Sequence, residues 1–131
     1  MTFRVVSEIR AWVLAQELAV DIYQLTSRDA VARDFGFRDQ LRRAAVSISS
    51  NIAEGFGRGG DREFVRFLDI ARGSAHEVLS LLHLSSRLGY STPEETSKLL
   101  GQLDDVIGRI AGLQNYLRNP RAGEALGDYQ L

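Results

Sequence analysis

Apolar residues recur along most of the chain at alternating steps of three and four residues, which is the spacing of one face of an α-helix. Each stripe continues over several helical turns, and no segment shows the strict alternation that is typical of a β-strand. The pattern therefore predicts an all-α protein with four long helices. The four stripes lie at residues 11–25, 37–52, 64–82 and 99–117.

The residues that flank the stripes set the helix boundaries. Thr92, Pro93 and Glu95 supply an N-cap, a first-turn proline and a capping-box glutamate ahead of the fourth stripe. Asp34 is a candidate N-cap for the second helix, and the glycines of residues 55–60 end it. The sequence predicts helices at about 7–27, 35–56, 61–88 and 92–118, followed by a loose C-terminal tail at 119–131.

Short connections between helices of this length favour one architecture. At a rise of 1.5 Å per residue each helix is roughly 30 to 40 Å long, and short loops place consecutive helices side by side in opposite directions. We therefore expect an antiparallel up-and-down four-helix bundle that forms a single domain at residues 1–118.

The composition removes several classes of protein. The 131 residues include no cysteine, which excludes a disulfide framework and a cysteine-ligated zinc site. No apolar run approaches the roughly 20 residues that a membrane-spanning helix needs, and the first residues lack the pattern of a signal peptide. We therefore expect a cytoplasmic protein that has no membrane partner.

The charge balance is close to neutral. Sixteen basic and 17 acidic residues give a net charge of −1, unlike the strongly basic surface that is typical of nucleic-acid binding. All basic residues except Lys98 are arginine, a residue that pairs with carboxylate or phosphate through two hydrogen bonds. Composition alone does not decide between these two partners.

The first predicted helix carries more apolar surface than its own bundle needs. Its apolar arc is far wider than the roughly 100° of a helix on the outside of a monomeric bundle. This width predicts a protein interface, with a fold-back of the N-terminal segment or the tail as the alternative. Two residues of the third helix also lie opposite its core stripe. The predicted interface residues are Trp12, Val13, Val20, Tyr23, Ile70 and Leu84.

A polar strip runs along the second predicted helix beside its apolar seam. Gln40, Ser47, Asn51 and Glu54 fall within about 60° of one another on the helical projection. Polar groups so close to a core need partners, so we expect hydrogen bonds to neighbouring helices or to the turn after Gly55. The alternative is a binding site, including a metal or small-molecule site at Asn51 and Glu54.

The glycines at residues 55–60 literally match the dinucleotide-binding pattern G-x-G-x-x-G. They follow a helix and not a strand, so we reject that interpretation and assign them to a helix cap. Arg58 and Arg62, beside the start of the next helix, are candidate phosphate contacts. Arg38 and Arg42 form a second candidate pair, with ion pairing to Asp34 or Asp39 as the alternative.

The sequence offers no catalytic or metal-binding template. It contains neither the Glu-x-x-His of helical di-iron bundles nor a G-x-S-x-G nucleophile motif. Asp69, His76 and His83 share one helical strip, but seven residues of helix separate each pair by about 10 Å, too far for one metal ion. We therefore predict a protein that is not an enzyme and that holds no cofactor or metal.

The segments QLRRAAVSISSNIAEG at residues 40–55 and FLDIARGS at residues 67–74, preceded by Trp12 and IYQLT at residues 22–26, resemble a known family. It is the four-helix-bundle family first noted as reading frames in intervening sequences of 23S ribosomal RNA genes. The resemblance implies an antiparallel bundle that assembles as a ring of five, and most members of the family have no assigned activity. The family-typical residues in this sequence are Gln40, Arg42, Arg43, Ser47, Asn51, Glu54, Gly55, Ser74 and Glu77.

The resemblance also leaves two functions open. A distantly similar branch, the accessory protein of diversity-generating retroelements, binds nucleic acid and a reverse transcriptase through a basic pentamer. This chain, with a pI of about 6.1, lacks that positive charge. The leading hypothesis is a non-enzymatic homo-oligomeric scaffold or adaptor. The second hypothesis is RNA or DNA binding by an oligomer that arrays Arg38, Arg42, Arg58 and Arg62 and gains strength from avidity.

Overall fold

Each apolar stripe folds into one long helix. The computed structural model describes residues 3–119, and within them the regular elements are five α-helices and one 3-10 turn, with no strand. Two of these elements are short: the 3-10 turn η1 at Val6–Glu8 and helix α2 at Asp29–Ala32. The long helices are α1 at Arg10–Thr26, α3 at Phe35–Gly57, α4 at Asp61–Arg87 and α5 at Pro93–Arg118.

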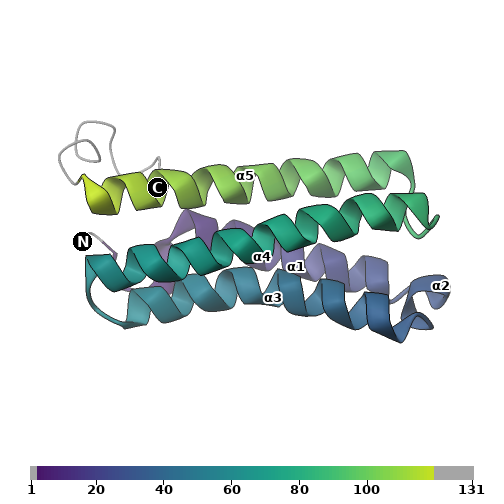
Figure 1. Ribbon diagram of the computed structural model, residues 1–131, viewed down its shortest axis with the longest axis horizontal. Helices are drawn as coiled ribbons and strands as arrows, with labels where there is room; N and C mark the ends of the chain where they lie inside the picture. Colours follow the sequence, from purple (N-terminus) through teal and green to yellow (C-terminus); the bar gives the residue numbers. More distant parts are fainter. Residues whose placement is uncertain (1–2, 120–131) are drawn as a thin grey trace.

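The four long helices pack as a bundle in chain order (Figure 1). Helix α1 packs against α3 and α5, and α4 packs against the same two helices, so α1 and α4 lie diagonally opposite. Consecutive long helices run in opposite directions along the long axis of the molecule. Each helix contributes fully buried side chains to one central core, including Leu18, Leu41, Leu68 and Leu103.

The helix ends follow the predicted capping chemistry. The Thr92 hydroxyl accepts a bond from the Glu95 backbone N–H at 3.1 Å, and the Glu95 carboxylate accepts one from the Thr92 N–H at 3.0 Å. The Asp34 carboxylate accepts a bond from the Phe37 N–H at 3.2 Å. Gly59 and Gly89 follow the ends of α3 and α4 with φ of 84° and 75°, a region that favours glycine.

The structure differs from the sequence prediction at the N-terminal half of the chain. The first helix begins at Arg10 rather than at residue 7, because residues 6–8 form the 3-10 turn. Helix α2 was not predicted, since a four-residue helix is too short to show a periodic stripe. It nevertheless buries Val31 in the core. The predicted tail lies outside the described residues from residue 120 onward.

Candidate interaction surface

A groove between α1 and α3 gathers exposed apolar residues of both helices. Val20 and Tyr23 of α1 are 56% and 43% exposed, and Val46 of α3 is 40% exposed. They line a depression of about 460 Å³, which shares Tyr23, Val46 and Ser50 with a second depression of about 600 Å³. We call this groove, with Val20, Tyr23 and Val46 as its apolar residues, the α1/α3 face.

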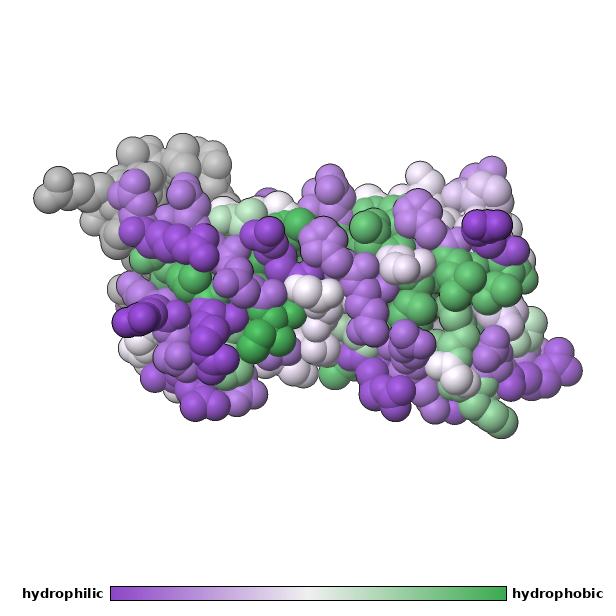
Figure 2. Space-filling view, in the orientation of Figure 1, coloured by the Kyte–Doolittle hydropathy of each residue, from purple (hydrophilic) through white to green (hydrophobic). Residues whose placement is uncertain are grey.

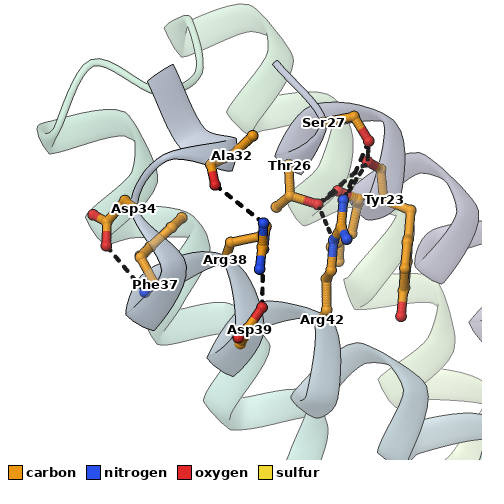
Figure 3. A network of polar contacts seen from close by, with 10 residues as sticks. Tyr23, Thr26, Ser27, Ala32, Asp34, Phe37, Arg38, Asp39 and Arg42 are labelled. Carbon is orange, nitrogen blue, oxygen red and sulfur yellow. Dashed lines mark hydrogen bonds and ion pairs between the residues drawn. The ribbon is translucent and has the colours of Figure 1, made fainter. Parts of the chain in front are cut away.

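Arg42 holds Tyr23 in place on this face (Figure 3). Its Nε donates to the Thr26 hydroxyl at 2.7 Å, and Nη2 donates to the Tyr23 carbonyl at 3.4 Å and to the Ser27 hydroxyl at 3.2 Å. The guanidinium also lies over the Tyr23 ring, 4.3 Å from its centre. A cation at the C-terminal end of α1 interacts favourably with the helix dipole. Arg42 therefore links α3 to the last turn of α1.

The other predicted interface residues divide into two groups. Trp12 and Val13 are half-buried, and Trp12 packs against the core, so the bundle itself already covers part of both. Ile70 and Leu84 are 42% and 43% exposed on α4. Figure 2 shows the side of the molecule that carries α3 and α4, where apolar side chains reach the surface in separate areas divided by polar ones.

The predicted polar strip forms hydrogen bonds between α3 and α4. The Ser47 and Ser74 hydroxyls lie 2.8 Å apart, and the Asn51 amide donates to the Ser47 carbonyl at 2.8 Å and to its hydroxyl at 3.0 Å. The Gln40 amide donates to the Glu77 carboxylate at 3.4 Å. The Ser47–Ser74 and Gln40–Glu77 bonds connect two neighbouring helices, as the interhelical interpretation of the strip predicts, and the Asn51 bonds stay within α3.

The polar strip and the neighbouring family-typical Arg43 were expected to be buried, which is wrong for three of these residues. Gln40, Arg43 and Glu54 are exposed, because the strip extends around α3 beyond the seam with α4 into solvent. Glu54 forms an ion pair with Arg58 at 2.9 Å. Within residues 3–119 no group of three or more His, Cys, Asp or Glu residues is placed to hold a metal ion.

Gly55, which follows the strip on α3, is buried. A Cβ atom at this position would lie 2.6 Å from the Cβ of Phe67 and 3.0 Å from the ring of Phe64. Glycine is therefore required for the close approach of α3 to α4 at this end of the bundle. Its role is packing, in addition to the cap that the sequence indicates.

The four candidate phosphate contacts do not form one surface. Arg38 pairs with Asp39 at 2.9 Å, and Arg42 is engaged with the end of α1. Arg58 pairs with Glu54, whereas Arg62 forms no hydrogen bond or ion pair within the described chain. Arg42 and Arg58 are 16 residues apart on α3, which corresponds to about 24 Å along the helix.

Two carboxylates stabilise the end of the bundle where α1 and α4 end and α3 and α5 begin. The Tyr90 hydroxyl, at 2.7 Å, and the Phe37 N–H together hold the pKa of Asp34 below its ordinary value. Arg28 and the capping box lower the pKa of Glu95 to about 2. Both carboxylates are bound by the fold as structural acceptors.

Comparisons with known proteins agree with the all-α architecture. A crystal structure of a protein of unknown function from the S23 ribosomal protein family of Bacteroides thetaiotaomicron is similar, with a TM-score of 0.72. The two chains are 23% identical, and the similarity covers 79% of this chain and 97% of the other. This likeness shows a shared fold. No curated protein matches the sequence.

The described residues include no helix that is both long and apolar enough to cross a membrane.

The model of the 23S rRNA-intervening sequence protein family matches residues 7–112, which is most of the chain and includes all four stripes up to the last turns of α5. The match confirms the resemblance that the polar strip and its flanking segments indicate. The chain belongs to the 23S rRNA-intervening sequence protein family.

Proposed function

We propose that the protein is a non-enzymatic, homo-oligomeric scaffold or adaptor whose copies associate through the α1/α3 face. The observation that carries the proposal is the exposure of Val20, Tyr23 and Val46 on one groove. Neighbouring exposed apolar side chains mark protein interfaces, and burying them contributes about 25 cal/mol for each Å² removed from water. The family resemblance supplies the expected number of copies, five.

Substitution of the groove residues tests this proposal. Val20→Glu together with Tyr23→Glu places two carboxylates on the face, and we expect the assembly to dissociate to the 14.6 kDa chain. Ala111→Glu, at an exposed position of α5, is the matched control and should leave the mass unchanged. Sedimentation or light scattering gives the mass. An unchanged assembly in the double variant would overturn the role of this face.

Nucleic-acid binding is the competing proposal, and the geometry favours it less. Three of its four arginines already have partners within the chain, and the two pairs lie at opposite ends of α3. Fluorescence anisotropy with short RNA and DNA at low and near-physiological salt distinguishes the proposals. Binding that weakens steeply with salt, and a shallower salt slope after Arg62→Gln, would support nucleic acid. We expect no binding from the intact assembly.

A further inference from the structure

A second apolar surface lies on a different side of the bundle. Ile70 and Leu84 are both more than 40% exposed on α4, and their spacing of two heptads places Glu77 midway between them on the same side of the helix. We call these three residues the α4 patch. Pairing of the α1/α3 face with its own copy in a second chain would leave the α4 patch uncovered. A head-to-tail contact covers both surfaces.

Hydrogen bonds fix the position of the α1/α3 face along the bundle axis, which we call its height. The Gln16 amide of α1 donates to the Ser49 hydroxyl of α3 at 3.0 Å. Because the two helices are antiparallel, this bond places Val20, four residues after Gln16, level with the residues just before Ser49. Val20 and Val46 therefore lie at the same height along the bundle axis and face the same groove.

The bonds between α3 and α4 fix the height of the α4 patch in the same way. Gln40 bonds to Glu77 and Ser47 bonds to Ser74, so residues 40–47 of α3 lie level with residues 74–77 of α4. Arg43 lies midway along that stretch of α3. The centre of the α4 patch is therefore at the height of Arg43 and of the apolar residues of the α1/α3 face.

The charges at this height are complementary. Arg43 is exposed beside the α1/α3 face and forms no hydrogen bond or ion pair within residues 3–119. Glu77 is exposed in the α4 patch, and its only partner in the same part of the chain is the Gln40 amide at 3.4 Å. Rotation about an axis parallel to the bundle preserves height, so it places Arg43 of one copy at the height of Glu77 of the next.

The angle between the two surfaces fits a small closed ring. Helix α3 packs against both α1 and α4, so it forms the corner at which the two sides meet. Neighbouring sides of a square four-helix bundle meet at about 90°. A ring closes when this angle equals the full turn divided by the number of copies, which is about 90° for four copies and about 72° for five. The 90° corner of a square bundle equals the first value and is within about 20° of the second.

We propose that the α1/α3 face of one copy packs on the α4 patch of the next copy, with α3 turned toward the ring axis and Arg43 paired with Glu77 of the neighbour. The partner is a second copy of this chain, and this inference rests on the proposed self-association. It assigns the two sides of the contact and its ion pair.

Cross-linking tests which two surfaces meet. The chain has no cysteine, so Val20→Cys and Gly73→Cys introduce the only thiols, and Gly73 has open space for a side chain beside the α4 patch. Residues 20 and 73 lie on diagonally opposite helices of one chain, which prevents a bond within a copy. With a short dithiol-reactive cross-linker, the double variant should give a ladder of species, and each single variant should give none.

The outcomes separate this inference from the proposed function. If the wild-type protein is an oligomer but the double variant gives no ladder, the head-to-tail contact is overturned and self-association stands. The same conclusion follows if Val20→Cys alone gives cross-linked species. A monomeric wild-type chain overturns the proposed function.

Charge reversal tests the ion pair independently. Arg43→Glu and Glu77→Arg should each weaken assembly about tenfold or more through like-charge contact, and the double reversal should restore most of that loss. Circular dichroism of each variant verifies that the bundle is folded. A double variant as weak as the sum of the two single variants overturns the pair.

Discussion

Single residues show how the fold prepares the α1/α3 face. Arg42 combines three hydrogen bonds to the end of α1 with a stacked contact on Tyr23, so one side chain both caps a helix and orients an exposed ring. The sequence made Arg42 a candidate phosphate contact, whereas the structure shows its guanidinium bonded to the end of α1. The side chain needed to recognise this role lies 16 residues away in the sequence, at Thr26.

Replacing Arg42 by Gln should lower the free energy of unfolding by about 1 to 2 kcal/mol, because the helix-end charge and the ring contact are both lost. Lys98→Gln, which removes an exposed charge without a comparable network, should change it by less than about 0.5 kcal/mol. Urea unfolding in the Val20→Glu background, once sedimentation verifies that this variant is a single chain, measures the difference without a contribution from assembly. Equal effects of the two substitutions would contradict the assigned role of Arg42.

Gly55 provides a second test at the residue scale. Gly55→Ala should destabilise the bundle by about 1 to 3 kcal/mol, since the new methyl group meets Phe67 and Phe64. Gly108→Ala, within α5 and with open space around its Cα, should stabilise it by about 0.5 to 1 kcal/mol. Thermal or urea unfolding gives both values. Loss of stability in both variants would show that the close approach is not the cause.

Among the helices, α5 has the best-defined start. Thr92 and Glu95 form its capping box, and Arg28, from the segment between α1 and α2, also donates to the Glu95 carboxylate. The pKa of Glu95 is about 2, against an ordinary value of 4.5. A carboxylate with a lowered pKa stabilises the fold fully above its unfolded pKa, and this contribution is lost as the pH falls from 4.5 through about 2.

Glu95→Gln should therefore flatten the dependence of stability on pH between about 4.5 and 2, because glutamine retains the cap but has no charge to titrate. Glu94→Gln removes a carboxylate from the same helical turn without contact to Arg28 and serves as the control. Unfolding free energies across this pH range provide the measurement. An unchanged slope in Glu95→Gln would contradict the assigned ion pair.

The helices were predictable because each one carries its core stripe and end signals within its own sequence. The stripes at 37–52 and 64–82 lie within α3 and α4, and the capping residues before α5 act as the sequence indicates. The interaction surface was less predictable, since its shape depends on which helices are neighbours. Val46 lacked any signal of its own, and it becomes part of a groove only because α3 packs beside Val20 of α1.

At the scale of the whole molecule, a bundle with two separate apolar surfaces is suited to assembly. The α1/α3 face and the α4 patch lie on different sides of the molecule, so association through both surfaces joins more than two copies. The net charge of −1 adds little repulsion between copies. The proposed scaffold function therefore requires an assembled state that covers these surfaces.

The mass of the wild-type protein in solution, measured over a range of concentrations, tests this central claim most directly. We expect an assembly of about five copies of the 14.6 kDa chain, reduced to single chains by Val20→Glu with Tyr23→Glu. A wild-type mass of one chain at every concentration would contradict it.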